Sequence, residues 1–138
     1  MNVLVIDGQG GGIGRQLVAR LREALPDAAI TAVGANCSAT NAMLKAGASS
    51  GATGENAVVV ACRRADVIAG PVGIVIADAL GGEITPVMAV AVAQSPAKRV
   101  LLPFNHCDNT IVGVADYNVA RLVQSAVEEI VRIFSEEP

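Results

Sequence analysis

The sequence predicts an α/β fold built on a single doubly wound, mainly parallel five-stranded sheet. Short apolar segments alternate along the 138 residues with segments of helical periodicity, which is the pattern of consecutive strand–helix–strand units. A glycine-rich turn, Gly8 to Gly14, lies between the first strand segment and the first helical segment. A chain of this length forms one core, so we expect a single Rossmann-like nucleotide-binding domain over residues 1–138.

The first strand and the first helix are predicted from different periodicities. Residues 1–7 are almost continuously apolar, as in buried parallel strands. After the glycine turn, apolar residues recur at every fourth position with charged residues between them, which is typical of an amphipathic helix. These apolar residues are Ile13, Leu17, Leu21 and Leu25.

The middle of the chain is divided by glycine and proline. After a Pro-Asp break, residues 29–34 are predicted as the second strand and residues 38–46 as a helix. The glycine-rich stretch 51–56 is predicted as a turn. Residues 57–64 contain three consecutive valines, which favour a strand, but the preceding turn suits a helix, and we assign a helix. Residues 66–70 are the third predicted strand.

Proline and threonine mark the helices of the second half. Pro71 suits the first turn of a helix, which we predict to reach Leu80. Thr85 as N-cap, followed by a proline, starts a helix over 87–94. The next predicted elements are a buried strand over 98–104, a loop over 105–109 and a last strand over 110–114. A final helix is predicted after them, with Asp116 as its cap. Its apolar stripe from Val119 to Phe134 is expected to pack on the core.

The glycine turn is the main candidate site. Glycine lets a ligand approach the backbone closely, and the free N–H groups at the start of the next helix attract anions. The turn resembles the G-x-x-x-G-I-G turn of short-chain dehydrogenases, with Asp7 where that family usually has threonine. We therefore expect a small-molecule nucleotide, with NAD or NADP as the leading cofactor. The alternatives are a purely structural turn and a site for a different anion.

Other loops that follow strands are expected at the same edge of the sheet. No carboxylate follows the second strand, where dehydrogenases hold the ribose, so Asn36 or Ser38 is the expected ribose contact and the choice between NAD and NADP stays open. Asp7 is expected to accept hydrogen bonds from the amides of the glycine turn. The predicted cofactor-binding residues are Gly8, Gln9, Gly10, Gly11, Gly12, Ile13, Gly14, Asn36, Ser38 and Gly70.

Catalytic residues are harder to assign. The Tyr-x-x-x-Lys pair of the short-chain enzymes is absent, because Tyr117 is followed by Arg121. His106 can titrate near neutral pH and Cys107 is a potential nucleophile, so these two residues are the catalytic candidates. Three hypotheses follow: a nucleotide-binding protein that acts as a sensor or partner subunit, a small enzyme using the Asn105–Asn109 loop, and a structural oligomer subunit without cofactor.

Charge, hydropathy and cysteine content limit the partners, the cellular compartment and the metal sites that we expect. The net charge is −3 and the basic residues are scattered, which argues against a nucleic-acid partner. No apolar run is long enough to cross a membrane, and the N-terminus has no basic leader, so we expect a cytoplasmic protein without a membrane partner. The three cysteines are widely spaced, which predicts reduced thiols and no metal site.

The segment 87–93 is apolar all round, which predicts burial on every side. In so small a domain, a second copy of the chain is the simplest cover, so a homodimer or higher homo-oligomer is expected. The alternative is a central helix that its own fold surrounds completely.

Several longer segments together resemble a family of short bacterial proteins known only as a domain of unknown function. That resemblance implies a Rossmann-like fold and no assigned activity. The segments are DGQGGGIG at 7–14, MLKAGA at 43–48, ATGENA at 52–57, GPVGIVIADAL at 70–80 and GEITPVMAVA at 82–91.

Overall fold

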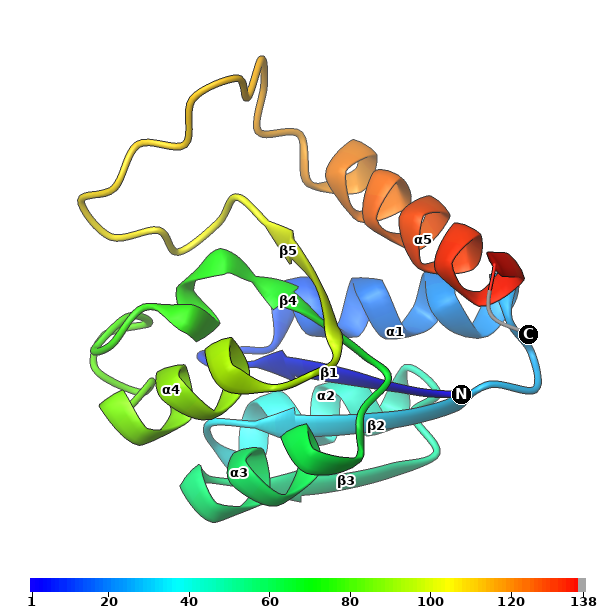
Figure 1. The fold of residues 1–138 in the computed structure, drawn as a ribbon, viewed down its shortest axis with the longest axis horizontal. Helices are drawn as coiled ribbons and strands as arrows, with labels where there is room; N and C mark the ends of the chain where they lie inside the picture. Colours follow the sequence, from blue (N-terminus) through cyan, green and yellow to red (C-terminus); the bar gives the residue numbers. More distant parts are fainter. Residues whose placement is uncertain (137–138) are drawn as a thin grey trace.

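Five parallel strands form one sheet in the order β3-β2-β1-β4-β5 in the computed structural model, which describes residues 1–136 (Figure 1). From β1 the chain moves outward through β2 to β3, then returns to the other side of β1 for β4 and β5. The predicted doubly wound, Rossmann-like fold is therefore confirmed, with its topological switch point between β1 and β4. The strands are β1 Asn2–Asp7, β2 Ala29–Gly34, β3 Ser50–Thr53, β4 Val67–Pro71 and β5 Lys98–Leu102.

Helices cover both faces of the sheet. On one face α1 packs between α2 and α5, and on the other face α3 packs beside α4 (Figure 1). A short 3₁₀ helix, η1, follows β4. The bounds are α1 Gly12–Ala24, α2 Cys37–Lys45, α3 Glu55–Arg64, η1 Val72–Val75, α4 Pro86–Gln94 and α5 Val119–Glu136.

The central strand β1 contributes to both apolar layers. Val3 and Val5 pack with α1 and α5, whereas Leu4 and Ile6 pack with α3 and α4, and none of the four is more than 1% exposed. Successive side chains of a strand point to opposite faces. A strand buried on both faces is therefore apolar at every position, which explains the continuous apolar run in the sequence. The apolar stripe of α5 packs on the core as predicted.

Two strand predictions were wrong. The 51–56 stretch was predicted as a turn, but Ser50–Thr53 forms the edge strand β3, paired with β2. All four of its residues are exposed, so no apolar pattern marks it. Residues 110–114 form no strand because they have no neighbouring strand to pair with, and Val112 is 92% exposed. β5 therefore stays at the edge of the sheet.

Two helix predictions also need correction. The helix predicted from Pro71 to Leu80 is absent, because Pro71 ends β4 and only η1 follows it. Asp78 and Leu80 have positive φ angles of 68° and 58°, which no right-handed helix accommodates. The final helix is capped by Asn118 rather than Asp116, since the Arg121 amide donates to Asn118 Oδ1 at 3.0 Å.

The sequence predicted that the apolar helix α4 is buried on every side. This chain alone does not bury it completely. Met88 and Val92 are buried against the sheet, but Val87 and Val90 are each 50% exposed. The outer side of α4 is therefore an apolar surface. Within residues 1–136, none of the helices is both long and apolar enough to cross a membrane.

Candidate functional site

A cleft of about 360 Å³ opens at the carboxyl edge of the sheet. One wall is the glycine turn after β1 and the start of α1, and the other is Phe104 and Asn105 after β5, with Val119 at the start of α5. This is the edge at which doubly wound folds bind their ligands, near the switch point in strand order. Of the predicted binding residues, the cleft is lined by Gly8, Gln9, Gly10, Gly12 and Ile13.

Three glycines of the turn lie in close contact with neighbouring residues. A Cβ atom on Gly8 would lie 2.7 Å from Leu80 Cδ2, and one on Gly14 would lie 2.6 Å from Met43 Sδ. Gly11 has a φ of 73° and lies against the backbone of Ala39. These glycines let α1 pack closely on its neighbours, so their presence needs no ligand.

Gly10 and Gly12 differ from the other glycines of the turn. Neither has a positive φ, and a Cβ atom on either would meet nothing within 4 Å. Within residues 1–136, neither backbone N–H donates a hydrogen bond to another residue. Unpaired N–H groups at a helix N-terminus are satisfied by water or by a ligand. These two residues therefore present open backbone to the cleft.

Asp7 lies beneath the glycine turn and is 2% exposed. Its carboxylate accepts hydrogen bonds from the Gly8 amide at 2.8 Å and the Gly14 amide at 2.6 Å, which is the role expected from the sequence. Burial raises the pKa of Asp7 above its usual value, although the amide hydrogen bonds act in the opposite direction, and the negative charge of Glu83 adds to the increase. Asp7 thus occupies part of the anion-attracting end of α1.

Glu83 is a site residue that the sequence did not identify. It comes from the loop between η1 and α4, and its carboxylate accepts hydrogen bonds from the Gln9 amide and from Asn36 Nδ2, both at 2.6 Å. Asn36 also donates to the Gln9 carbonyl at 2.9 Å and accepts from the Ala39 amide, which caps α2. The β2 side of the carboxyl edge is therefore closed by the chain itself.

The other predicted binding residues do not line the cleft. Asn36 serves as the cap of α2, as described above. Ser38 lines a separate groove of about 780 Å³ between α1 and α2, beside Arg15 and Lys45. Gly70 lies within β4, where a Cβ atom would come within 2.3 Å of the Ile6 carbonyl oxygen. This glycine allows β1 and β4 to approach closely, and it is a packing residue.

His106 and Cys107 lie in the segment after β5, outside the residues that line the cleft. Their one mutual contact is between His106 Nδ1 and the Cys107 carbonyl oxygen, at 3.1 Å. Within the described residues no hydrogen bond joins Asp108 to His106. The His106 ring instead lies 6.2 Å from the Tyr117 ring, centroid to centroid. Among residues 1–136, no acid–base partner is hydrogen-bonded to the Cys107 side chain.

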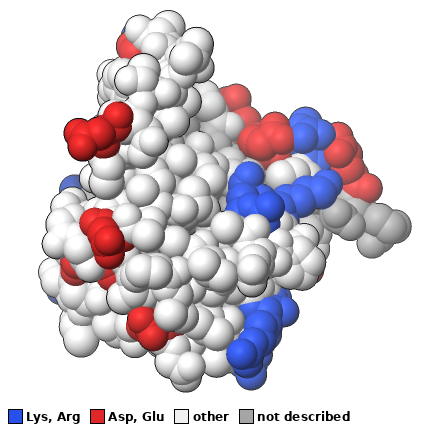
Figure 2. Space-filling model, turned by 60° about the vertical axis from the view of Figure 1, so that its left-hand side comes forward, with Lys and Arg blue, Asp and Glu red and all other residues white. Residues whose placement is uncertain are grey.

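The charges are unevenly distributed around the carboxyl edge. Figure 2, which brings this side of the molecule forward, shows a largely uncharged surface, with acidic residues along the left of the view and lysine and arginine next to further acidic residues on the right. Asp7 is the one ionisable side chain among the described residues that line the cleft. A ligand in the cleft therefore meets backbone and apolar groups more than charged side chains.

The fold and the cleft define a small Rossmann-like protein with a ligand-sized opening at its switch point. Residues 2–135 match the family described as domain of unknown function DUF3842, and the chain belongs to this family. The resemblance seen in the sequence is thereby confirmed.

The chain was also compared with curated proteins and with solved structures. No curated protein matches the sequence. The chain is similar to a dodecameric, FMN-dependent UbiX-like decarboxylase from Escherichia coli O157:H7, with 15% identity, a TM-score of 0.47, and coverage of 99% of this chain and 95% of that one.

The prediction of NAD or NADP as cofactor was wrong. The similar solved structure is described as FMN-dependent. The geometry gives a physical reason for the correction, because a dinucleotide in a Rossmann fold extends toward the end of the second strand. There the Asn36 side chain is already engaged, because its amide nitrogen donates to Gln9 and Glu83 and its oxygen accepts from Ala39.

Proposed function

We propose that this protein binds a phosphorylated ligand of mononucleotide size in the cleft at the carboxyl edge, and that it acts as a sensor or as a subunit that presents the bound ligand to a partner. The phosphate would lie at the N-terminus of α1, against the backbone of Gly10 and Gly12. The remainder of the ligand would lie between the glycine turn and Phe104.

The open backbone of Gly10 and Gly12 is the observation that carries this proposal. Gly12 is the first residue of α1. Neither its φ angle nor a neighbouring atom requires a glycine there. Close approach of a ligand to the backbone supplies a reason for the glycine, and the unpaired N–H groups supply donors for phosphate oxygens.

The size of the ligand is inferred from the two ends of the cleft. Its volume of about 360 Å³ lies near the lower end of ligand pockets, which range over roughly 300–1,000 Å³. The Glu83 carboxylate, bound to Gln9 and Asn36, closes the β2 side. Phe104 and Val119 provide an apolar wall on the other side, suited to a planar ring.

The role as a binding protein is inferred from the chemistry of the lining. Asp7 is buried and already holds two amides, so it is poorly placed to transfer protons to a ligand. Phe104, Asn105, Gln9 and Gln16 offer no nucleophile and no strong acid or base. Such a lining favours recognition over catalysis.

The test is thermal unfolding of the protein with FMN, AMP, ATP and inorganic phosphate, followed by calorimetric titration of any ligand that raises the midpoint. A ligand present at 100 times its dissociation constant adds about 2.7 kcal/mol, which raises the midpoint by several degrees. We expect G12A to weaken binding at least about tenfold, because the new methyl group occupies the approach to the backbone. The same substitution should leave the free protein equally or slightly more stable.

Ser38→Ala is the matched control, because it changes a helix residue near the same edge that lies outside the cleft. It should leave affinity unchanged. If none of the four compounds shifts the midpoint, or if Ser38→Ala weakens binding while G12A does not, the proposal is wrong.

A further inference from the structure

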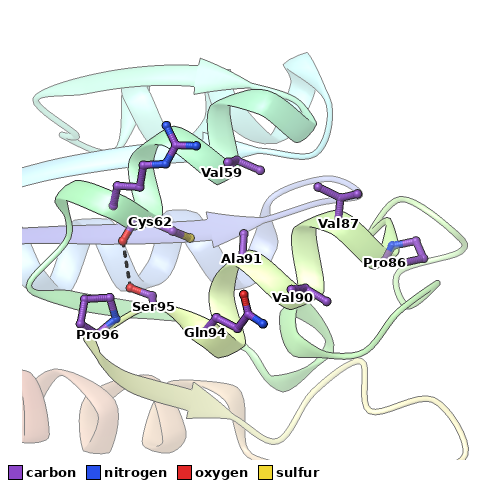
Figure 3. Close-up of a pocket in the computed structure, with 10 residues that line it drawn as sticks. Val59, Cys62, Pro86, Val87, Val90, Ala91, Gln94, Ser95 and Pro96 are labelled. Atoms are coloured by element: carbon purple, nitrogen blue, oxygen red, sulfur yellow. Dashed lines mark hydrogen bonds between the residues drawn. The ribbon is translucent and has the colours of Figure 1, made fainter.

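A second opening lies away from the cleft, between α3 and α4, and shares no lining residue with it. This groove has a volume of about 550 Å³ (Figure 3). Val59 and Cys62 line it from α3, and Val87, Val90 and Ala91 line it from α4. Burial raises the pKa of the Cys62 thiol to about 11, so at neutral pH it is an uncharged part of the groove.

The α4 side of the groove is a regular apolar stripe. It consists of Val87, Val90, Ala91 and Gln94, at the i, i+3, i+4 and i+7 positions that share one face of a helix. None of these side chains is charged, and the two valines are each half exposed. A contiguous exposed apolar patch of this kind is typical of interaction surfaces. The small side chains also allow a second helix to approach closely.

The α3 side carries opposite charges at its two ends. One face of α3 presents Glu55, Val59, Cys62 and Arg63, at the i, i+4, i+7 and i+8 positions. Glu55 and Arg63 are both exposed. Neither forms an ion pair within residues 1–136. Arg63 thus lines the groove at the end of α3, and Glu55 lies on the same helix face at the start of α3, beyond the lining residues.

We infer that this groove is a self-association surface, on which a second copy of the chain docks antiparallel about a two-fold axis. In such an interface the same patch is used by both copies. Antiparallel packing places Glu55 of each copy opposite Arg63 of the other, while the valines of the two α4 helices cover each other. The charge pattern is complementary to itself, which is why the occupant is a second copy rather than an unrelated protein. The inference goes beyond the proposed function and does not depend on it.

The apolar part of the interface is tested with Val90→Glu, measured by sedimentation velocity from 1 to 200 µM at low ionic strength. We expect the wild type to form dimers in this range and Val90→Glu to weaken dimerisation at least about a hundredfold, because a carboxylate would be buried without a partner. Val90 is half exposed, so the substitution should leave the fold intact. Val112→Glu, on a side chain that is 92% exposed, is the matched control and should dimerise like the wild type.

The charged part is tested with a charge swap. Glu55→Arg alone and Arg63→Glu alone each make both contacts repulsive, and each should weaken dimerisation about tenfold or more. An equimolar mixture of the two variants should form heterodimers, because both contacts then pair opposite charges. The inference is overturned if the wild type stays monomeric, if Val90→Glu dimerises normally, or if the mixture associates no better than its components.

Discussion

Two segments leave the carboxyl edge of the sheet beside the cleft, the glycine turn after β1 and the 103–118 segment after β5. Both contained predicted site residues, but they are held in place very differently. The glycine turn is fixed by contacts to residues far along the chain: Gly8 lies against Leu80, Gly11 against Ala39 and Gly14 against Met43. In Figure 1 the 103–118 segment extends away from the body of the molecule.

The hydrogen bonds within the 103–118 segment are mostly local. Asn109 donates to the His106 carbonyl through its amide at 3.0 Å and through its side chain at 2.7 Å. Edge-on packing of Phe104 and Tyr117, 6.2 Å apart, joins the two ends of the segment. A wall fixed by long-range packing is preorganised, whereas a wall with few buried contacts can adapt. In the second wall, Phe104 and Val119 pack on the core and Asn105 lies against Gly73, so the adaptable part is the stretch between Asn105 and Val119.

The largest effect should come from filling the packed glycine turn. In Gly14→Ala the new Cβ atom would lie 2.6 Å from Met43 Sδ and 2.8 Å from Asp7 Cβ, so α1 must shift. Overpacking of this kind costs about 1–3 kcal/mol, and we expect about 2 kcal/mol in urea unfolding. Gly12→Ala, two residues away, should cost nothing. Equal stabilities for the two variants would contradict the distinction between packed and open glycines.

A smaller effect is expected at Asp7. Asp7→Asn leaves one of the two amide donors poorly paired and should cost about 1–2 kcal/mol at pH 7. Because the pKa of Asp7 is raised in the fold above the unfolded value of about 3.9, its protonation favours folding. The stabilisation that comes from protonation of Asp7 is complete below the pKa of Asp7 in the unfolded chain. It is lost as pH rises through the pKa of Asp7 in the folded protein.

The stability gap between wild type and Asp7→Asn should therefore widen as pH falls from 7 toward 4. Urea unfolding at a series of pH values measures the gap, and contributions from other titrating groups cancel in the difference. A gap that narrows on acidification would show that burial does not dominate at Asp7.

The glycine turn shows what could be predicted from the sequence and what could not. Its place between a strand and a helix followed from local periodicity, and the same reasoning placed α1, α3 and β4. The division of its glycines into packed and open ones could not be predicted, because it depends on residues such as Ala39 and Met43 that become neighbours only in the fold.

The missed elements lacked the signals that sequence reasoning uses. β3 has four exposed residues and is defined only by its pairing with β2. The 110–114 segment has the β-branched residues of a strand but no partner, and pairing rather than propensity decides strand formation. Glu83 contacts Gln9 and Asn36, which lie 74 and 47 residues away in the sequence. The loop before Glu83 has positive φ angles at Asp78 and Leu80 as well as at glycines, and non-glycine residues give no sequence signal for such a conformation.

The smallest effect is expected in the 103–118 segment. Asn109→Ala removes the side-chain hydrogen bond to the His106 carbonyl, but Asn109 is exposed, so the free energy of unfolding should change by less than about 0.5 kcal/mol. Hydrogen exchange should nevertheless become faster within this segment while the amides of Gly8 and Gly14 stay protected. If exchange accelerated equally at the glycine turn, the 103–118 segment and the glycine turn would be coupled, and both would have to be treated as parts of one cooperative unit.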